Sequence, residues 1–539
     1  MIHEPTVEQK LIYSEIKDIV ASPKCGRNLM IEADAGTGKS STIQDGTRFI
    51  PDNISGKKFE KTVLYLAYNT HIADDYRPKA LPNTEVRTTH SHGFKAILST
   101  FKYGQGKEVT LDEYKVNDLV KHMLTTKYLE VGEENTKLLR SIVPKLVSQL
   151  KSTLMPVSKE SIEYLADKFR VEDFYILLEN NNEKIYKNDS GTEYVIDAEF
   201  VSTMCSEIMK ICFRVFLPGE SCSIDYDDQF WLPLVRPDIR IKKFPWVIVD
   251  EAQDLNPAQM KLVMMSVIQN GTIVVVGDPH QSIYAFRGAD SQAMPKMKEQ
   301  LNAKVFTLSE CFRCPTSHVE YAQKYVPGIR PHAGNKAGVI EHINDTILIN
   351  SLKNSIPNKD PVYVLCRNNY PLVKPCFELI RDGINATIRG REIGKNLISR
   401  IRATKGTEIE EFKKNLTEWM KNKKASLEQG NKSVELLVDT YETIIALSAD
   451  CDNTDQLIAK IDRIFSDKDS AIVFSTIHKV KGFESDKIYV LYPELMPSPY
   501  AKTEEAMEQE NNVQYISATR SKDTMIFVHE LKEGKKQNF

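Results

Sequence analysis

The chain has 539 residues and a net charge of −3, and its 41% hydrophobic and 27% charged content is typical of a soluble globular protein of about three or four domains. No apolar run approaches the ~18 residues that a membrane helix needs, and the first residues lack the layout of a signal peptide, so we expect neither a membrane helix nor a signal peptide. The charge excludes a globally basic field, so local patches must hold any polyanion, and the nine scattered cysteines favour a reduced, intracellular chain.

The first predicted element is an amphipathic helix over residues 5–20, in which Ile12, Ile16 and Ile19 recur at helical spacing behind a polar cap. Gln9 lies near the start of this helix. A glutamine amide offers one donor group and one acceptor group, which matches the edge of adenine. Taken alone, however, Gln9 is better interpreted as a surface residue.

A phosphate-binding loop is predicted at residues 33–40, Ala-Asp-Ala-Gly-Thr-Gly-Lys-Ser, between an apolar run at 29–31 and a helix over 41–49. Gly36 and Gly38 allow the backbone to turn tightly and to bring its N–H groups up to a phosphate. The N-terminus of the following helix adds a partial positive charge, so the loop is suited to an anion.

The end of this loop carries the side chains for nucleotide chemistry. Lys39 can reach the β- and γ-phosphates, and the hydroxyl of Ser40 can bind Mg²⁺. Ala33 stands where the usual pattern has glycine. The alternative is a glycine-containing turn with a solvated lysine, which the strand–loop–helix setting disfavours.

Residues 62–68 predict a buried parallel strand, and residues 86–94 predict another strand that ends in a polar loop. In open α/β sheets, ligands bind at the carboxyl ends of strands. His90 and His92 in this loop suggest a metal, but no third ligand follows nearby, so hydrogen bonding or nucleic-acid contact is the better interpretation. From about 101 to 225, helical periodicity and charge predict an inserted helical subdomain.

The run 244–249 predicts a buried strand that ends in two acids, Asp250 and Glu251. Two carboxylates at a strand tip, in a chain with a phosphate loop, suit Mg²⁺ coordination and activation of water. Asp250 would hold the metal, and Glu251 would orient and deprotonate the attacking water. The alternative, a charged helix cap, does not explain the position at the end of a strand.

The next buried strand, over 272–277, runs into a loop that contains a glutamine, two aromatic residues and an arginine. Planar side chains of this kind stack on unpaired bases. A second strand-rich region and a charged helical stretch at about 400–465 follow; the predicted strands are 305–308, 362–366, 471–474, 488–491 and 524–528. The pattern predicts an α/β fold with two parallel-sheet cores, each interrupted by a helical insertion.

The second core contributes two arginines, Arg313 and Arg520. Either one alone is best interpreted as a salt-bridge residue, but together with a phosphate loop and an acid pair they suggest arginine fingers that stabilise a transition state. Cys311 and Cys314 form a single CxxC pattern, and without further ligands it does not predict zinc or redox chemistry.

These motifs, in this order, resemble the UvrD/Rep/PcrA group of superfamily 1 DNA helicases, from about residue 5 to residue 522. The matching segments are 33–40 for motif I, 68–70 for Ia, 88–94 for Ib, 249–254 for II, 277–290 for III, 308–313 for IV, 364–368 for IVa, 475–484 for V and 515–522 for VI. The sequence QSIY…RGAD within 277–290 is highly specific to this group. The resemblance implies two RecA-like domains.

Carried over by position, the resemblance implies three sets of residues. At the ATP site, the resemblance implies that Gln9 reads adenine, Phe312 stacks on the base and Glu484 contacts the ribose. The phosphates would be bound by Ala35, Gly36, Thr37, Gly38, Lys39, Ser40 and Ser41. The catalytic set is the base, the γ-phosphate sensor and the two fingers: Glu251, Gln281, Arg313 and Arg520. Nucleic-acid contacts are implied at Asn69, His90, Phe286, Arg287, Arg367, His478 and Lys479.

The sequence departs from the group in two respects. Phenylalanine at 312 and 286, where the group has tyrosine and often tryptophan, keeps a stacking face but loses a polar group. The second insertion is much shorter than its counterpart in the group, so a duplex-engaging or autoinhibitory role does not carry over. The predicted division is 1–100 with 225–300 as the ATP-binding core, 101–224 as its insert, 301–399 with 469–539 as the second core, and 400–468 as the short second insert.

The predicted function is an ATP-dependent DNA helicase that moves on single strands, with ATP and Mg²⁺ as cofactors. The polarity, 3′ to 5′, is implied by the resemblance alone. The expected partners are single-stranded and tailed duplex DNA, with replication or recombination proteins, and no membrane. The expected location is intracellular, and it is the cytoplasm or the nucleoid if the source is a bacterium or a phage. One alternative is a translocase that strips proteins or recombination filaments without processive unwinding. Another is a non-motor, ATP-gated loading factor.

Overall fold

The computed structural model describes residues 4–22, 26–54, 57–58, 60–169, 171–181, 184–187, 191–214, 222–283, 292–355, 360–425, 432–466 and 470–531. The chain divides into two compact units, residues 1–33 with 39–308 and residues 34–38 with 309–539. None of the helices in the described part of the chain combines the length and apolar character that a membrane span requires.

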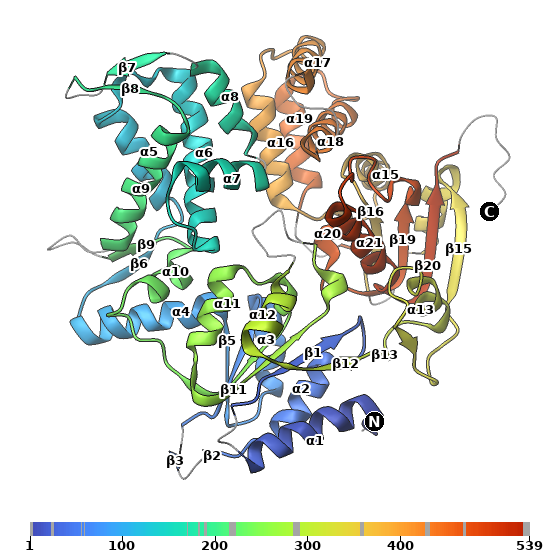
Figure 1. Cartoon of the computed structure of the whole chain (residues 1–539). Helices are drawn as coiled ribbons and strands as arrows, with labels where there is room; N and C mark the ends of the chain where they lie inside the picture. Colours follow the sequence, from blue (N-terminus) through green and yellow to red (C-terminus); the bar gives the residue numbers. More distant parts are fainter. Residues whose placement is uncertain are drawn as a thin grey trace. The chain divides into compact units, whose positions relative to one another are not determined.

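The first unit contains a six-stranded sheet in the order β12-β1-β11-β10-β4-β5, and every pairing in it is parallel. Figure 1 labels β1, β5, β11 and β12 of this sheet. Its strands are β1 (Leu29–Ala33), β4 (Val63–Ala67), β5 (Thr84–Thr88), β10 (Phe244–Val249), β11 (Val267–Gly277) and β12 (Lys304–Leu308). The helices of this core are α1 (Val7–Ala21), α2 (Lys39–Thr47), α3 (Thr70–Tyr76), α4 (Thr89–Leu98), α10 (Asp228–Val235), α11 (Pro257–Met265) and α12 (Ala293–Leu301). A short hairpin, β2 (Asn53–Ile54) and β3 (Lys57–Lys58), follows α2.

Side chains of each central strand alternate between two hydrophobic layers. Leu29 and Ile31 of β1 pack with α1 and α2, whereas Met30 packs with α11 and α12 on the other face. A parallel sheet covered on both faces buries its strands completely, which explains their continuous apolar runs. All six residues of β10 are accordingly buried.

A helical insertion lies between α4 and α10 in the chain (Figure 1). It has a hydrophobic core of its own, which also includes residues of these two helices. Its helices are α5 (Lys115–Thr126), α6 (Glu133–Thr153), α7 (Lys159–Lys168), α8 (Glu172–Asn181) and α9 (Ala198–Arg214). Its short strands are β6 (Val109–Leu111), β7 (Ile185–Lys187), β8 (Glu193–Val195) and β9 (Cys222–Ile224). The insertion lies where the sequence predicts a helical subdomain.

The second unit contains another all-parallel six-stranded sheet, in the order β15-β20-β19-β16-β18-β17. Its strands are β15 (Val339–Asn344), β16 (Val362–Cys366), β17 (Ala386–Ile388), β18 (Ile472–Thr476), β19 (Ser485–Leu491) and β20 (Ser521–His529). A further short pair is β13 (Glu310–Cys311) and β14 (Arg330–Pro331). The predicted fold class, two RecA-like parallel-sheet cores with helical insertions, is therefore confirmed; the edge strands β15 and β17 were not predicted.

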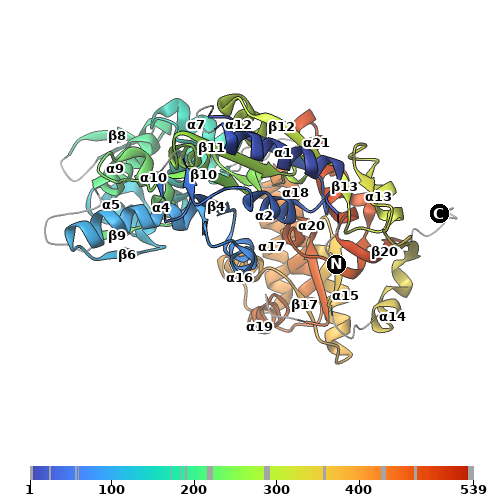
Figure 2. The same cartoon turned by 90° about the horizontal axis from the view of Figure 1, so that it is seen from below.

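The helices of the second unit are α13 (Thr316–Ala322), α14 (Leu348–Lys353), α15 (Tyr370–Arg381), α16 (Arg391–Ala403), α17 (Ile409–Ala425), α18 (Lys432–Leu447), α19 (Thr454–Ile464), α20 (Ile477–Val480) and α21 (Glu504–Ala518). Helices α16 to α19 form the second insertion, and Figure 2 shows α19 beside the edge strand β17. Phe412 and Leu457 of these helices lie in the same hydrophobic cluster as Val364 and Phe474 of the sheet. This insertion is therefore packed as part of the second core.

Two predictions about secondary structure are wrong. Residues 305–308 were predicted to open the second sheet, but β12 pairs with β1 from Leu29↔Lys304 to Ala33↔Leu308 and forms an edge of the first sheet. An apolar run predicts a strand but not its partner, which explains the error. The polar loop predicted after β5 is the helix α4, which begins at Thr89.

The start of α4 explains why its polar sequence was interpreted as a loop. Thr88 and Ser91 form a capping box, in which each side chain accepts a hydrogen bond from the backbone N–H of the other residue. Gly93 lies within the helix because α10 passes close by: a Cβ atom at this position would lie 2.0 Å from the carbonyl oxygen of Gln229. The glycine therefore serves helix packing, not a turn.

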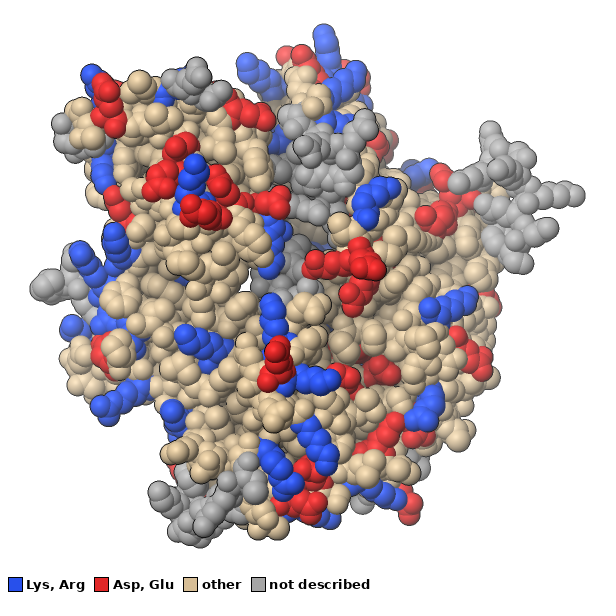
Figure 3. Space-filling view, viewed as in Figure 1, with Lys and Arg blue, Asp and Glu red and all other residues tan. Residues whose placement is uncertain are grey.

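Charges of both signs are interspersed over the face drawn in Figure 3. This distribution agrees with the small net charge of −3. Any polyanion must therefore be bound by local groups of basic residues.

Candidate functional site

The phosphate loop connects β1 to α2, and its backbone has the conformation that the glycines permit. Gly36 and Gly38 both have positive φ angles, 71° and 81°. The ammonium of Lys39 folds back over the loop and donates to the carbonyl oxygen of Ala33 at 3.3 Å. Ser40 follows in the first turn of α2. The local geometry is that of the predicted strand, loop and helix.

Asp250 and Glu251 lie at the tip of β10, in the middle of the first sheet. Nζ of Lys39 is 4.0 Å from Oε1 of Glu251, so the structure brings the loop lysine and the acid pair together. Asp250 is 3% exposed. Its burial, and to a smaller extent the negative charge of Glu251, raises the pKa of its carboxyl group to about 6. A cation bound there would favour the ionised carboxylate.

Glu251 has a left-handed backbone, with φ of 53°, which is uncommon outside glycine and is a form of strain found at functional sites. Its carboxylate accepts a hydrogen bond from the side-chain amide of Gln253. Oε1 of Gln253 in turn accepts from the backbone N–H of Asp278 at 3.1 Å. The acid pair is thus connected to the segment that follows β11.

That segment contains Gln281, which is 5% exposed and donates from Nε2 to Oδ2 of Asp278 at 2.7 Å. Gln281 therefore lies close to the acid pair through the Gln253–Asp278 connection. Phe286 and Arg287, which the sequence also placed in this loop, lie outside the described residues.

Gln9 connects α1 to α2. Its Oε1 accepts from the backbone N–H of Thr6 at 3.0 Å in a capping box, and its Nε2 donates to Oγ1 of Thr42 at 2.9 Å. The residue is therefore held beside the helix that carries Lys39 and Ser40. Its reading of adenine stays a prediction.

Residues 34–38 of the phosphate loop belong to the second unit by their contacts. The backbone N–H of Phe312 donates to the carbonyl oxygen of Gly36 at 2.9 Å, and that of Ala35 donates to the hydroxyl of Tyr515 at 2.8 Å. A Cβ atom on Gly36 would lie 2.7 Å from Cβ of Arg313, so only glycine fits this approach.

The guanidinium of Arg313 binds a carboxylate and a backbone carbonyl group of the second unit. It donates to Oε2 of Glu484 at 3.0 Å and to the carbonyl oxygen of Thr519 at 2.8 Å, while its buried Nε–H has no hydrogen-bond partner among the described residues. Arg520 is 3% exposed, directly after Thr519, and its Nε–H donates to Ile516. The structure thus brings together the predicted residues of motifs IV, V and VI.

The CxxC cysteines lie in the same region. Cys311 and Cys314 are both fully buried and pack with Ala35 in one hydrophobic cluster. Reactive thiols are usually accessible, so this burial favours a structural role.

The predicted nucleic-acid contacts are distributed over several elements. Asn69 caps α3, accepting from the backbone N–H of Ile72 at 2.9 Å, and His478 and Lys479 lie in α20, directly after β18. Arg367 is 12% exposed and pairs with Glu510 at 2.7 Å and with Glu435 at 3.4 Å. A nucleic acid would have to compete with these two carboxylates for Arg367.

His90 packs between two aromatic rings of the loop after β9 and of α10. Its ring centroid is 4.8 Å from that of Tyr226 and 5.1 Å from that of Phe230, and burial lowers the pKa of His90 to about 4. His90 is therefore neutral near pH 7. Tyr226 is 52% exposed and was missed from the sequence, where the only signal is an aromatic residue among the acids of the segment 225–228.

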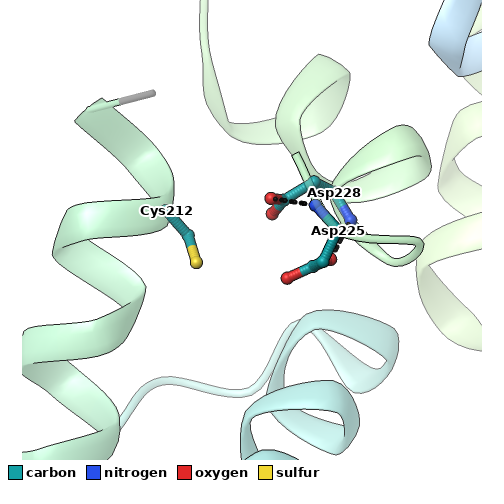
Figure 4. Close-up of side chains that lie close together, drawn as sticks. All are labelled: Cys212, Asp225 and Asp228. Atoms are coloured by element: carbon teal, nitrogen blue, oxygen red, sulfur yellow. Dashed lines mark hydrogen bonds between the residues drawn. The ribbon is translucent and has the colours of Figure 1, made fainter. Parts of the chain in front are cut away.

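A second group of ligand-type side chains lies in the helical insertion. Figure 4 shows Cys212 of α9 facing Asp225 and Asp228, whose carboxylates accept hydrogen bonds from each other's backbone N–H groups at 2.8 and 3.0 Å. Lys151 pairs with both aspartates, and Lys115 is 2.7 Å from Asp228.

These lysines oppose a metal at that group. Although burial opposes ionisation, Lys151 and Lys115 hold the pKa of Asp228 below its usual range. Two ammonium groups already balance two carboxylates, so a divalent cation would leave a buried excess of positive charge. The arrangement is a buried ion-pair network within the insertion.

Comparison with known proteins identifies the family of the chain. Residues 14–302 match the family described as the UvrD/REP helicase N-terminal domain. The F-box DNA helicase protein 1 of Schizosaccharomyces pombe is 22% identical over 582 residues, covering 97% of this chain and 57% of that protein. The ATP-dependent DNA helicase Rep of Buchnera aphidicola is 26% identical over 304 residues, covering 53% of this chain and 40% of that protein.

The F-box DNA helicase 1 of Gallus gallus is also 22% identical, over 97% of this chain and 49% of that protein. The chain thus spans about half the length of these curated relatives. The family match covers more than half of the chain and contains the phosphate loop, the acid pair and Gln281. The chain therefore belongs to the UvrD/Rep helicase family.

Proposed function

We propose that this chain is an ATP-dependent DNA helicase that moves along single-stranded DNA in the 3′ to 5′ direction. The observation that carries the proposal is the approach of the Lys39 ammonium to Glu251, beside Asp250 at the tip of the central strand β10. A lysine ammonium that binds phosphates, next to a pair of carboxylates, is the arrangement that hydrolysis of a nucleoside triphosphate requires. The family names of the relatives support DNA as the substrate.

The donor set suits Mg²⁺. Asp250 and Ser40 supply hard oxygen ligands, which this ion prefers, and the ion would neutralise charge on the phosphates. Glu251 would take the proton of the attacking water. Gln281 would contact the γ-phosphate, and Arg313 and Arg520 would stabilise the charge that develops during transfer.

The nucleoside would be held by Gln9, Phe312 and Glu484, with the backbone of residues 35–41 around the phosphates. Along the nucleic acid, Asn69, His90, His478 and Lys479 remain the proposed contacts, with Arg367, Phe286 and Arg287, and we add the exposed ring of Tyr226, since aromatic faces stack on bases. We also propose the four-part division of the chain that the sequence predicts, except that β12 belongs to the first core and the second insert begins with α16 at Arg391.

A second candidate function follows from the packing of α16 to α19. Because these helices share the hydrophobic cluster of the second sheet, they are not arranged as a separate duplex-binding body. This arrangement favours a translocase that strips bound proteins without processive unwinding. The non-motor loading factor is less well supported, since the complete acid pair suits hydrolysis.

The test is phosphate release with and without single-stranded DNA, followed by strand displacement on 3′-tailed, 5′-tailed and RNA-tailed duplexes. A helicase of the proposed polarity hydrolyses ATP faster with DNA and separates only the 3′-tailed DNA duplex. Lys39→Ala should abolish both activities, whereas Lys298→Ala, at an exposed position of α12, should retain them. Stimulated hydrolysis without displacement would favour the translocase, and hydrolysis that DNA does not stimulate would contradict both.

A further inference from the structure

Tyr65 of β4 lies directly beside Asp250 of β10. The two strands pair in parallel, with Ile248 opposite Tyr65, and the backbone N–H of Asp250 donates to the carbonyl oxygen of Leu66 at 3.0 Å. The hydroxyl of Tyr65 donates a hydrogen bond to Oδ2 of Asp250. Tyr65 is fully buried, so no bulk water competes for this contact.

Both oxygens of the Asp250 carboxylate are therefore held by donors. Oδ1 accepts from the backbone N–H of Glu251 at 2.9 Å, and Oδ2 accepts from Tyr65. Each carboxylate oxygen has two lone pairs, so these bonds orient the group and still leave lone pairs for a cation.

The position of the Tyr65 hydroxyl is itself determined by packing. Its ring stacks on Tyr76 of α3, with centroids 3.8 Å apart and planes inclined by 6°. Tyr76 is 4% exposed and belongs to the same hydrophobic cluster. The ring cannot move away from Asp250 without disturbing this stack.

We propose that Tyr65 is a positioning residue for the divalent cation of the nucleotide: its hydroxyl holds Asp250 in the orientation that binds the ion. The proposal rests on the proposed function, in which Asp250 holds Mg²⁺. Hydrogen bonds to the ligands of a metal ordinarily contribute 10–100-fold in metal affinity. Tyr65 lies in the strand that precedes residues 68–70, the segment that resembles motif Ia. It therefore lies outside all the segments that carry the resemblance to the helicase family.

The test compares Tyr65→Phe with Tyr76→Phe. Both substitutions remove one hydroxyl and keep a ring in the stack, but the hydroxyl that donates to Asp250 is that of Tyr65. Binding of Mn²⁺ to the ADP complex is measured by electron paramagnetic resonance. Tyr65→Phe should weaken Mn²⁺ binding about 10-fold and leave metal-free ADP affinity unchanged, whereas Tyr76→Phe should bind Mn²⁺ like the wild type.

The Mg²⁺ dependence of ATP hydrolysis shows whether Tyr65→Phe weakens binding of the ion or damages the active site in general. The Mg²⁺ concentration for half-maximal ATPase should rise about 10-fold in Tyr65→Phe, while the rate at saturating Mg²⁺ returns to near the wild-type value. Unchanged Mn²⁺ affinity in Tyr65→Phe, or equal weakening in Tyr76→Phe, would overturn the proposal.

Asp250→Asn distinguishes this failure from failure of the proposed function. If Asp250→Asn retains wild-type Mn²⁺ affinity, Asp250 is not a metal ligand and the proposed site itself is wrong. If Tyr65→Phe folds poorly because the buried carboxylate of Asp250 has lost its donor, the double variant Tyr65→Phe/Asp250→Asn removes that carboxylate as well. It then serves as the second variant. It should bind Mn²⁺ no more weakly than Asp250→Asn alone, because the tyrosine acts through Asp250; a further loss would overturn the proposal.

Discussion

Glu251 is the residue at which local strain and chemistry coincide. Its backbone is left-handed, and its carboxylate lies 4.0 Å from the ammonium of Lys39 and accepts a hydrogen bond from Gln253. A glutamate in this conformation has a cost of order 1–3 kcal/mol that the surrounding structure must offset. Such strain is typical of residues that are placed for function.

Glu251→Gln keeps the size of the side chain and removes the base. We expect kcat for ATP hydrolysis to fall by about 10²–10⁴, the usual contribution of a general base, while ATP binding persists. Measurements of phosphate release and of ATP affinity test both parts. Glu60→Gln, at a residue whose side chain is 84% exposed, is the matched control and should hydrolyse ATP at the wild-type rate. Only a few-fold loss in Glu251→Gln would show that another group removes the proton.

His92 makes stability depend on pH. The residue is 3% exposed and contacts the hydroxyl of Ser266 at 3.0 Å; burial, assisted by the charge of Arg87, lowers its pKa from 6.5 to about 3. Below pH 6.5 the unfolded chain therefore binds a proton at His92 that the folded chain does not bind. The contribution of the neutral His92 to the free energy of unfolding is therefore complete above this pH and is lost as the pH falls toward 3.

His92→Gln should reduce this loss. Between about pH 7.5 and about pH 5 the contribution of His92 is on the order of 2 kcal/mol, by linkage from the two pKa values. Urea unfolding at both pH values measures the difference. His122→Gln, at an exposed position of α5, is the control and should change the difference in unfolding free energy between the two pH values less than His92→Gln does. An equal pH dependence in His92→Gln and the wild type would show that His92 is protonated in both states or in neither.

At the scale of elements, α6 depends on one charged residue in its buried face. Lys151 is fully buried and is the shared partner of Asp225 and Asp228, which lie at the junction of β9 and α10. The network joins the longest helix of the insertion to the segment that returns to the first core. Removing one partner from a buried ion pair leaves uncompensated charge.

Lys151→Met should therefore destabilise the insertion by about 3–5 kcal/mol, although methionine suits a helix. Lys137→Met, in the same helix, changes a side chain that is 73% exposed and paired with Glu133, so we expect almost no change in stability. Thermal melting of both variants gives the comparison. Similar melting temperatures would show that the network contributes specificity and not stability.

At the scale of the whole molecule, the proposed binding of nucleic acid would take place at a net charge of −3. Both signs of charge are interspersed on the face shown in Figure 3, so attraction must come from particular basic residues. Lys479 is a candidate: it follows β18, and a Cβ atom on Gly390 would lie 2.7 Å from its Nζ.

Binding to single-stranded DNA should weaken with salt by about 0.7 in log K per log salt for each phosphate neutralised. Lys479→Gln should reduce this slope by about 0.7, whereas Lys298→Gln should not change it. Fluorescence anisotropy over a range of salt concentrations measures both slopes. A flat response in the wild type would contradict a binding track that contacts phosphates.

The sequence by itself determined the local chemistry of this protein. The phosphate loop, the buried central strands and the acid pair Asp250–Glu251 are recognisable because a tight glycine turn, a continuous apolar run and a strand-end carboxylate each depend on neighbouring residues. The capped helix α1 is recognisable for the same reason. These features were sufficient to predict both sheet cores.

Tertiary structure alone decided how distant residues meet. It placed β12 beside β1 and packed α16 to α19 into the second sheet's hydrophobic cluster. It also brought Tyr65 to Asp250, Lys151 to two aspartates, and Arg367 to Glu510. An apolar strand or a charged side chain does not encode its partner, because the pairing is selected by the burial and charge balance of the entire fold.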